Sequence, residues 1–395
     1  MEIKDLVLLG GARTPMVESN GRFAGLPALE LGALAAKAAL ERTGTAPDEI
    51  QHAVVGNALQ TSPDAIYGAR HVALHAGVPR EVPALTVNRL CGSGIQSIVS
   101  ASHMMLAGEV DTCLVGGMES MSQAPHCIWG ARQGLRLGQG KLEDLLFVAL
   151  YDPYCGCFMA QTSNNLARDF GITREQQDRF AVRSQELAAA AWEAGRLAEE
   201  VVPVEVRLGR KTVTVERDDH LRPGTTLEVL SGLPTAFDDD GFVTGGNASG
   251  IVDGAAMMVL TTAEKAAAEG RRPLGRLLGW TTVGVDPSRM GIGPAPAIRS
   301  LLDKLGMGLA DIDLVEINEA FAGQTLAVVE DLELDVDKLN VNGGAIALGH
   351  PLGATGTRLV LTLLMELRRR GGGIGIASAC IGGGQGIAIA VEAVA

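Results

Sequence analysis

The first and last thirds of this 395-residue chain repeat the same short motifs in the same order. An acidic turn before a buried segment, a Val-Asn pair before a Gly-rich turn, and a segment closed by Gly-Gly each occur twice. The matching pairs are 48–58 with 311–320, 87–88 with 341–342, and 114–117 with 380–383. Their separation is far too long for a solenoid repeat. The pattern therefore predicts two similar halves packed together, with equivalent turns meeting at one crevice.

Alternating strand and helix patterns in the first half predict an α/β fold. The expected strands are 6–9, 53–55, 85–87 and 112–115, and the expected helices are 29–42 and 95–106. This alternation favours a mainly parallel sheet with helices on both faces. Aromatic residues make up only 4% of the chain and glycines number 51, so Ala, Val, Leu and Ile must fill the core. Such a composition suits closely packed α/β layers.

The middle of the chain is more polar and less regular, and we expect it to form an inserted loop domain. One helix should begin at Thr173, because Gln176 three residues later completes a capping box. Alternating residues at 201–206 and 212–215 predict an exposed hairpin. The chain is expected to divide into three parts. They are 1–120 plus 251–272 for the first half, 121–250 for the loop domain, and 273–395 for the second half.

Charge and composition argue against several classes of protein. The net charge is −13, and the one dense basic stretch, 368–370, falls at an expected helix end, so nucleic-acid binding is not indicated. Residues 371–391 lack charge but are broken by Gly triplets, which predicts a strand, a turn and a strand, and no membrane span. Six cysteines in so long a chain do not form a disulfide framework. With no targeting segment visible, we expect a cytosolic protein.

Cys91 and His350 each lie in a Gly-rich turn before an expected helix. Cys91 follows a strand in the stretch 88–94, where the helix dipole should lower the pKa of the thiol. The alternative for Cys91 is a buried structural cysteine. His350, in the stretch 342–356, could activate a thiol or stabilise an oxyanion, and the alternative is a core histidine bonded to backbone.

Two further turns at strand ends complete a candidate site. Cys380 precedes a Gly triplet whose N–H groups could bind an oxyanion, and Asn318 offers an amide that could orient a water molecule. Acyl transfer needs a nucleophile, a base and an oxyanion hole, and this chain has a candidate for each.

At these four motifs, and from the first strand to the last, the chain resembles the thiolase family. The resemblance implies a five-layer αβαβα fold and an acyltransferase that makes or cleaves 3-oxoacyl-CoA by a ping-pong route. It implies that Cys91 carries the acyl group, that His350 activates it, and that Cys380 moves the α-proton. It further implies that Asn318 holds a water in one oxyanion hole, with the N–H groups of Cys91 and Gly382 forming the second.

The resemblance also implies contacts with coenzyme A, which is expected as substrate and product, with no tightly bound cofactor. The expected contacts are Arg222, Thr225, Ser249, Met159 and Phe321. For Arg222, Thr225 and Ser249 the alternative is an ordinary surface loop. Homodimers or homotetramers are expected from the family, and the residues do not choose between them.

One departure concerns the acyl pocket. Where many acetoacetyl-CoA thiolases have His-Met-Gly, this chain has Phe158, Met159 and Ala160. An apolar residue there favours longer acyl chains, and other stretches look most similar to mitochondrial-type 3-ketoacyl-CoA thiolases. We therefore expect broad 3-oxoacyl-CoA specificity that includes acetoacetyl-CoA, the alternative being a strict acetoacetyl-CoA thiolase.

Other constellations are expected to be structural. His71 and His75 are four apart without an acidic or Cys partner, and 238–240 lacks the downstream ligands of a calcium loop, so no metal site is indicated. Cys155 and Cys157 form a single C-x-C pair, for which pocket lining or packing is favoured over redox chemistry. A ketoacyl synthase usually lacks a second cysteine, and a non-catalytic acyl-CoA binder should have lost reactive side chains. Both are therefore disfavoured alternatives.

Overall fold

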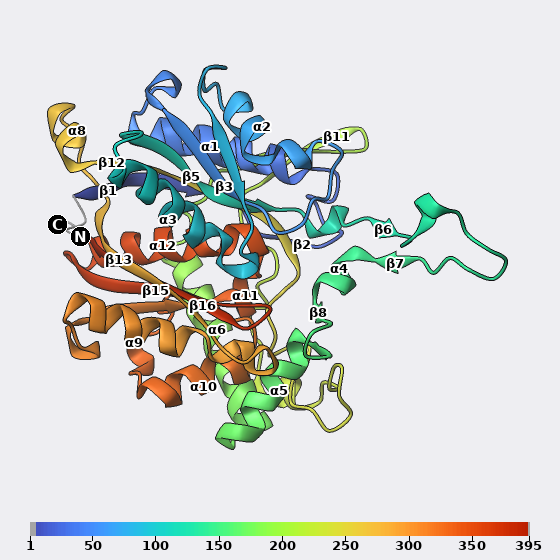
Figure 1. Cartoon of the computed structure of the whole chain (residues 1–395). Helices are drawn as coiled ribbons and strands as arrows, with labels where there is room; N and C mark the ends of the chain where they lie inside the picture. Colours follow the sequence, from blue (N-terminus) through green and yellow to red (C-terminus); the bar gives the residue numbers. More distant parts are fainter. Residues whose placement is uncertain (1–4, 394–395) are drawn as a thin grey trace.

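The structure, a computed structural model, describes residues 5–393. Ten strands form one sheet in the order β14-β15-β16-β13-β1-β12-β5-β3-β4, with β2 paired to β12 (Figure 1). The strands are β1 Leu6–Arg13, β2 Val17–Glu18, β3 His52–Gly56, β4 Ala84–Val87, β5 Thr112–Glu119, β12 Val252–Thr262, β13 Gly275–Gly284, β14 Leu314–Ile317, β15 Gly373–Ile381 and β16 Gln385–Ala393. The expected strands of the first half and the strand–turn–strand at 371–391 are confirmed.

The sheet is mixed, so the prediction of a mainly parallel sheet is wrong. Parallel pairing is confined to the outer strands, where β3 pairs with β4 and β5, and β14 pairs with β15. The central strands β5, β12, β1, β13 and β16 pair antiparallel. The reason is connectivity: β12 returns from the middle segment, and β16 follows β15 through a tight turn. Neither strand therefore arrives by the helical crossover that parallel neighbours need.

Helices cover the sheet on its outer faces and also fill the space between its two halves. They are α1 Ala28–Thr43, α2 Gly68–His75, α3 Ser93–Leu106, α8 Ala263–Ala268, α9 Pro294–Leu305, α10 Ala322–Leu332, α11 Ala345–Leu348 and α12 Leu352–Arg369. Single helical turns lie at η1 Pro47–Glu49, η2 Ala65–Tyr67, η3 Leu90–Gly92, η4 Met121–Gln123, η5 Ala131–Gln133, η6 Pro287–Ile292, η7 Leu309–Asp311 and η8 Val336–Lys338.

Five layers result from the way alternate strand residues pack. In β1, Val7 and Leu9 join the outer core under α1, whereas Leu6 and Leu8 join the central core with α3 and α12. That central core also takes residues from β15 and β16 of the second half, whose opposite face is covered by α9 and α10. The layers are thus helix, sheet, helix, sheet, helix (Figure 1). This is the αβαβα arrangement that the resemblance implied.

The two central helices approach closely near their N-terminal ends. A Cβ atom on Gly94 of α3 would lie 2.4 Å from the backbone nitrogen of Thr357 in α12. A Cβ atom on Gly356 would lie 2.5 Å from the backbone nitrogen of Ile95. Only glycine permits this approach. As a consequence, the turns that precede α3 and α12, one from each half, open at the same place.

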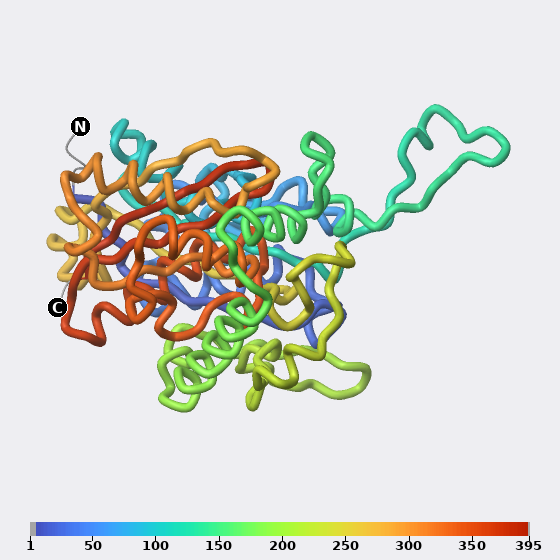
Figure 2. The backbone as a smooth tube through the Cα atoms, turned by 90° about the horizontal axis from the view of Figure 1, so that it is seen from below, coloured from blue at the N-terminus to red at the C-terminus, as the bar shows by residue number. Residues whose placement is uncertain are grey.

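The segment between β5 and β12 lies against both halves and also projects from them. Its elements are β6 His126–Cys127, β7 Glu143–Asp144, α4 Leu145–Ala149, β8 Tyr151–Asp152, β9 Cys157–Phe158, α5 Met159–Phe170, α6 Arg174–Glu193, β10 Val204–Leu208, β11 Lys211–Val215 and α7 Leu227–Ser231. The capping box of α6 is confirmed, because the Thr173 N–H donates to the Gln176 side chain over 2.7 Å. The β10–β11 hairpin is also confirmed. Residues 125–144, which we call the arm, extend away from the body (Figures 1 and 2).

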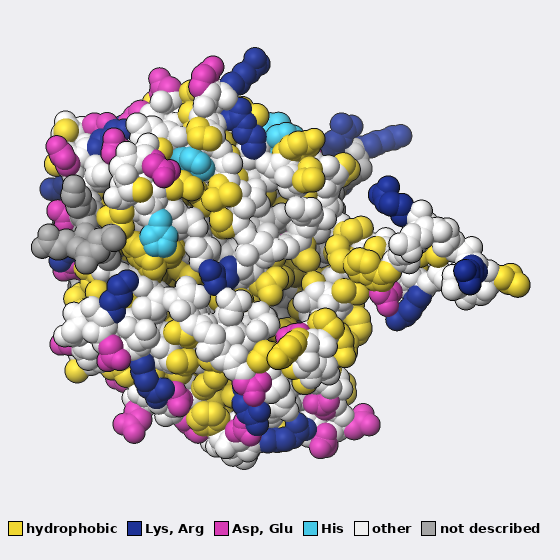
Figure 3. Space-filling view, in the orientation of Figure 1, with side chains coloured by type: hydrophobic (Ala, Val, Ile, Leu, Met, Phe, Trp, Pro, Cys, Tyr) yellow, Lys and Arg dark blue, Asp and Glu magenta, His cyan; other side chains and the backbone are white. Residues whose placement is uncertain are grey.

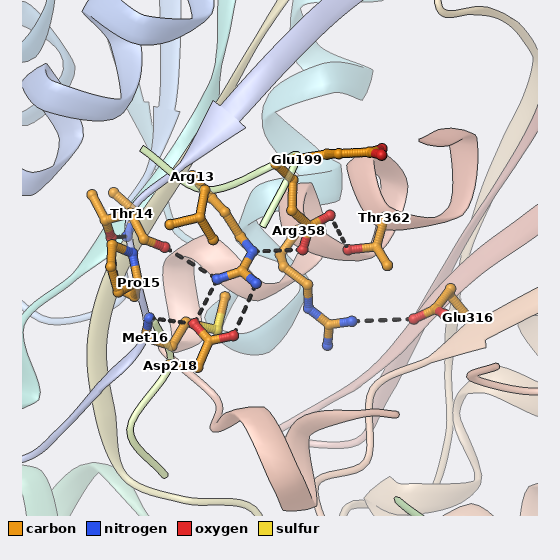
Figure 4. Close-up of polar contacts among 12 residues, drawn as sticks. Arg13, Thr14, Pro15, Met16, Glu199, Asp218, Glu316, Arg358 and Thr362 are labelled. Atoms are coloured by element: carbon orange, nitrogen blue, oxygen red, sulfur yellow. Dashed lines mark hydrogen bonds and ion pairs between the residues drawn. The ribbon is translucent and has the colours of Figure 1, made fainter. Parts of the chain in front are cut away.

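A buried charge network fastens this segment to the two halves. Arg13, at the end of β1, donates to both carboxylate oxygens of Asp218, over 2.6 and 2.9 Å, and to Glu200 over 2.6 Å. Glu200 also accepts from Thr362 of α12 over 2.8 Å. Figure 4 shows the paired Arg13 and Asp218, with Thr362 nearby. Arg13, Glu200 and Asp218 are buried, so each charge depends on its partners.

None of the helices within residues 5–393 has the length and apolar character needed to cross a bilayer.

Candidate active site

Cys91 lies in the helical turn η3 between β4 and α3. Leu90, just before it, has φ of +46°, a left-handed conformation that is uncommon for leucine. The backbone N–H groups of Gly382 and of Cys91 itself lie near the Cys91 sulfur and lower the pKa of the thiol. Burial nevertheless raises the pKa of the thiol to about 11. The expectation that the helix N-terminus lowers this pKa is therefore wrong for the free site, because loss of solvation outweighs these N–H groups.

His350 follows Gly349, whose φ of +92° turns the chain between α11 and α12. Its Nδ1 lies 2.6 Å from the hydroxyl oxygen of Thr355, and that hydroxyl donates to the carbonyl of Pro351 over 3.0 Å. Because the hydroxyl proton is already used, Nδ1 must carry the imidazole proton and Nε2 must present a lone pair. Burial, and then the positive charge of Arg358, lower the imidazole pKa to about 3. His350 is therefore neutral and ready to accept a proton at Nε2.

Asn318 directly follows β14 and is fully buried. Its N–H donates to the carbonyl of Ser378 over 3.0 Å, and its Nδ2 lies 3.2 Å from Nε2 of His350. Within residues 5–393 its Oδ1 has no hydrogen-bond partner although it is buried. An unpaired buried carbonyl oxygen is costly, so this atom is well suited to bind a water molecule or a substrate donor.

Cys380 is fully buried at the end of β15. It packs with Met290 and Ala320, and Met159 and Phe321 lie against this cluster. Burial raises the pKa of the Cys380 thiol, and the nearby Cys91 sulfur raises it further. The two thiols are therefore close enough for a charge on one to disfavour ionisation of the other. Cys380, which is buried more deeply, is the weaker acid.

A narrow cavity of about 70 Å³ opens at the Cys91 turn. It is lined by Leu90, Cys91, Ala149, Leu150, Met159, Ser249, Met290, Ala320, Phe321, His350, Leu352 and Gly382. A groove of about 390 Å³ continues from it, because Ser249 and Phe321 line both. The structure thus brings together Cys91, His350, Gly382, Met159, Ser249 and Phe321, with Asn318 and Cys380 packed directly behind.

The turn that carries Ser249 is joined by backbone hydrogen bonds to the turns that carry His350 and Asn318. Ser249 N–H donates to Ala320 over 3.0 Å, and His350 N–H donates to Gly250 over 2.9 Å. A Cβ atom on Gly250 would lie 2.5 Å from the His220 ring. The end of the middle segment is therefore held in a fixed position beside both His350 and the residues after Asn318.

Arg222 and Thr225 lie outside the cavity and the groove. The Arg222 guanidinium pairs with Glu18, which lines the groove, and the backbone N–H of Arg222 donates to Oε1 of Gln185 over 2.8 Å. Thr225 donates its hydroxyl to the Arg222 carbonyl over 2.7 Å. These two residues therefore form part of the rim, and only the partner of Arg222 reaches the groove.

Phe158, expected in the acyl pocket, does not line the cavity. Its ring lies 4.6, 5.0 and 4.9 Å from those of Phe147, Tyr151 and Phe237, between centroids. Met159 faces the cavity instead. Phe158 thus supports the cavity wall from behind, and its influence on substrates must pass through Met159 and Leu150.

The sequence interpretation did not identify two buried residues next to the site, Thr355 and Glu119. Thr355 fixes the His350 tautomer, and its position one helical turn into α12 was the available signal. Glu119 at the end of β5 accepts from the N–H groups of Ala58, Leu59 and Gly353 over 2.8–3.0 Å. Burial raises its pKa to about 7. It joins the turn after β3 to the start of α12, and so fixes the two halves against each other.

Known proteins with similar sequences and structures cover the whole length of this chain. Sequence profiles of the N-terminal and C-terminal thiolase domains match residues 6–264 and 271–393. Human mitochondrial 3-ketoacyl-CoA thiolase is 48% identical over 394 residues, covering 100% of this chain and 99% of that protein. Acetyl-CoA acetyltransferase of Cupriavidus necator is 46% identical over 391 residues, covering 98% and 99%.

Solved structures agree with the sequence comparison. The crystal structure of the human mitochondrial 3-ketoacyl-CoA thiolase superimposes with a TM-score of 0.98 over 100% of both chains. That of the Bacillus anthracis acetyl-CoA acetyltransferase is 43% identical and gives 0.97 over 99% of each chain. Among residues 5–393, no group of three or more His, Cys, Asp or Glu is placed to bind a metal ion. Sequence and structure together show that the chain belongs to the thiolase family.

Proposed function

We propose that this acyltransferase interconverts 3-oxoacyl-CoA plus CoA with acyl-CoA plus acetyl-CoA, using Cys91 as the acyl carrier. The observation that carries the proposal is the placement of two thiols, one imidazole and one amide around a single cavity. Cys91 and His350 line it, and Cys380 and Asn318 stand directly behind. Relatives named 3-ketoacyl-CoA thiolase and acetyl-CoA acetyltransferase support the same reaction class.

In the first half-reaction of thiolysis, the Cys91 sulfur attacks the 3-oxo carbon as its proton moves to Nε2 of His350. The 3-oxo oxygen, which becomes the oxygen of the acyl-Cys91 thioester, takes its negative charge near the N–H groups of Cys91 and Gly382. Protonated Nε2 and a water held at Oδ1 of Asn318 can donate to the thioester oxygen of the departing acetyl-CoA unit. The bond between the α- and β-carbons breaks and leaves the acyl group on Cys91. The acetyl-CoA carbanion takes its proton from Cys380, and its thioester oxygen is stabilised by hydrogen bonds.

In the second half-reaction, the Cys380 thiolate removes the proton of an incoming CoA thiol. The CoA sulfur attacks the acyl-Cys91 thioester, and Cys91 leaves with the proton held by His350. The N–H groups of Cys91 and Gly382 lie near the Cys91 sulfur, next to where a thioester oxygen would lie. They are suited to serve as the second oxyanion hole. The high pKa of Cys380 makes its thiolate a strong base, as removal of an α-proton requires in the reverse direction.

CoA is proposed to enter along the groove that continues from the cavity. The groove is bordered by Ser249 and Phe321 at its inner end and by Glu18 and His220 further out. A solved structure of the human mitochondrial 3-ketoacyl-CoA thiolase in complex with CoA superimposes with a TM-score of 0.97. Met159, Ser249 and Phe321 are proposed to contact the pantetheine and acyl parts, with Arg222 and Thr225 toward the nucleotide end.

Acetylation of Cys91 is the direct test. Incubation with acetyl-CoA should add one acetyl group to the protein, and peptide mapping should locate it on Cys91. A Cys91→Ala variant should show none, while Cys380→Ala should still be acetylated but make no acetoacetyl-CoA. Binding of acetyl-CoA without a covalent acetyl group would mean a non-catalytic binder.

Chain-length preference is proposed to be broad. Met159, Leu150 and Phe321 give the cavity an apolar lining, and the wall behind Met159 is aromatic. Thiolysis rates for acetoacetyl-CoA and 3-oxooctanoyl-CoA test this proposal. Turnover of both supports it, whereas activity on acetoacetyl-CoA alone identifies a strict acetoacetyl-CoA thiolase.

Self-association is proposed from two exposed apolar regions. The arm carries Trp129 and Leu142, which are 63% and 62% exposed, and hydrophobic side chains gather where it joins the body (Figure 3). The edge strand β4 has an open side, with Leu85 40% exposed, next to the exposed Tyr67. Unpaired edges and apolar patches of this kind are usually covered in an assembly. Light scattering during gel filtration should therefore give a dimer or tetramer mass.

The compartment is proposed to be the cytosol, on composition and cysteine usage alone. Several relatives are named as mitochondrial proteins, which favours a different location. Cell fractionation with antibody detection separates the two.

A further inference from the structure

Cys155 and Cys157 lie close together in the exposed turn of the β8–β9 hairpin. The hairpin pairs Tyr151 with Phe158 and Asp152 with Cys157, so Cys155 lies in the connecting loop. The Cys157 sulfur is 3.5 Å from the Cys155 carbonyl oxygen, and the Cys155 sulfur is 3.9 Å from the Asp152 carbonyl oxygen. Neither lines the cavity or the groove, so of the two structural roles expected for them, pocket lining or packing, only packing is left.

The backbone of this turn suits a cross-link between the two sulfurs. Gly156, between them, has φ of +70°, which bends the chain sharply. Two Cα–Cα steps of about 3.8 Å joined by such a bend bring the outer Cα atoms within the disulfide range of about 4.4–6.8 Å. Both cysteines are partly exposed, and the adjacent Tyr154 is 87% exposed, so a small reagent can reach the turn.

We propose that Cys155 and Cys157 form a dithiol that a low-molecular-weight disulfide closes to a disulfide within the turn. In the first step, the thiolate of one cysteine attacks glutathione disulfide, forming a mixed disulfide and releasing one glutathione. In the second, the other cysteine attacks the mixed disulfide and releases the second glutathione. The protein loses two hydrogen atoms and the glutathione disulfide gains them. The second step is intramolecular, and therefore outcompetes a second glutathione.

The closed turn would act on the cavity wall, because the two ends of the hairpin line the cavity. Leu150 and Met159 both face Cys91's cavity, and the Met159 N–H donates to the Leu150 carbonyl over 2.9 Å. With two residue pairs, the hairpin is too short to be rigid by itself. A cross-link at its tip restricts how far Leu150 and Met159 can separate to admit a longer acyl chain. This consequence rests on the proposed function, whereas formation of the disulfide does not.

Mass spectrometry tests the dithiol directly. The full-length Cys91→Ala protein, which cannot form a Cys91–Cys380 bond, is equilibrated for hours in a glutathione redox buffer, quenched with acid and digested without reductant. Burial raises the pKa of Cys155 to about 11, so the first attack is slow at neutral pH and long equilibration is needed. We expect the peptide holding Cys155 and Cys157 to lose two hydrogen atoms, and Cys127→Ser to behave the same way. Only singly glutathionylated peptides, or no reaction, would overturn the proposal.

Measurements of turnover test whether the Cys155–Cys157 disulfide restricts the cavity wall at Leu150 and Met159. Oxidised wild-type protein, with Cys91 and Cys380 shown by mapping to be free thiols, should lose severalfold in kcat/KM on 3-oxooctanoyl-CoA and little on acetoacetyl-CoA. Dithiothreitol should restore the loss, and Cys155→Ser and Cys157→Ser should not show it. If the disulfide forms without any change in chain-length profile, the effect on the cavity wall is refuted. If all turnover is absent even in the reduced protein, the proposed function fails while the dithiol stands.

Discussion

Nδ1 of His350 lies 2.6 Å from the hydroxyl oxygen of Thr355, and this contact sets the tautomer of the imidazole. Thr355 gives its own proton to the Pro351 carbonyl, so the imidazole proton must be on Nδ1. The lone pair on Nε2 then faces Asn318 and the cavity. A residue that does not line the cavity thus determines which imidazole nitrogen presents its lone pair toward the cavity.

Replacing Thr355 with valine should lower kcat by roughly 10- to 100-fold with little change in KM, since an unsatisfied buried donor costs about 1–3 kcal/mol. The valine keeps the shape of the side chain but leaves the Nδ1 proton without an acceptor. Thr355→Ser, which keeps the hydroxyl, should retain activity near the wild-type level. Steady-state thiolysis of acetoacetyl-CoA measures both variants. A loss in Thr355→Ser with none in Thr355→Val would show that packing of the methyl group, and not the hydrogen bond, is what His350 needs.

The alkylation rate of Cys91 should rise with pH without a plateau near neutrality. The pKa of the thiol is about 11 and that of His350 about 3, so both are neutral at pH 7 in the free enzyme. The thiolate fraction, and with it the rate of reaction with iodoacetamide, should increase about tenfold per pH unit from pH 7 to 9. The adduct on Cys91 is followed by peptide mapping. A plateau below pH 8 would instead indicate a thiolate–imidazolium pair favoured by the helix N-terminus.

Substituting histidine for Phe158 should shift turnover toward short substrates. The Phe158 ring packs against Phe147, Tyr151 and Phe237, so a smaller polar ring loosens the support behind Met159 and places a donor in an apolar cluster. The ratio of kcat/KM for 3-oxooctanoyl-CoA to that for acetoacetyl-CoA should fall severalfold. Phe158→Leu, which stays apolar, is the matched control and should change the ratio less. An unchanged ratio in Phe158→His would show that the wall does not select chain length.

Protein stability should depend on the titration of Glu316. Burial raises the pKa of this carboxyl to about 8 despite the nearby Arg358, whose Nη1 lies 3.1 Å from Oε2. Between the ordinary pKa of 4.5 and about 8, the folded protein keeps a proton that the unfolded chain releases. The contribution of Glu316 to the free energy of unfolding is therefore complete at low pH and declines as the pH rises through that window.

Thermal unfolding of wild type and Glu316→Gln across about pH 5 to 8 measures this titration. The melting temperature of the wild type should fall relative to that of the variant as the pH rises. Asp239→Asn, which alters an exposed carboxylate, should parallel the wild type. A wild-type advantage that grows with pH would show that Glu316 is ionised and paired with Arg358.

Local patterns determined much of the fold. The capping box at Thr173 placed the start of α6, and alternation located the β10–β11 hairpin, because both depend on residues a few positions apart. The Gly triplet after Cys380 marked the turn between β15 and β16 for the same reason. Local patterns did not predict the pairing of β12 with β1 and β5. That pairing depends on hydrogen bonds between segments more than a hundred residues apart.

For the candidate site, too, some features could be predicted from the sequence and others depend on the tertiary structure. The sequence by itself marked Cys91, His350, Cys380 and Asn318 as candidates, because each lies in a turn at the end of a strand or the start of a helix. The repeated halves predicted that such turns meet, as they do around the cavity. Tertiary structure decided their chemistry. The pKa of Cys91 is raised by surroundings from both halves, the tautomer of His350 depends on where the Thr355 hydroxyl points, and Met159 faces the cavity in place of Phe158. Burial and hydrogen-bond partners arise only when the chain is packed, so no local pattern could have supplied them.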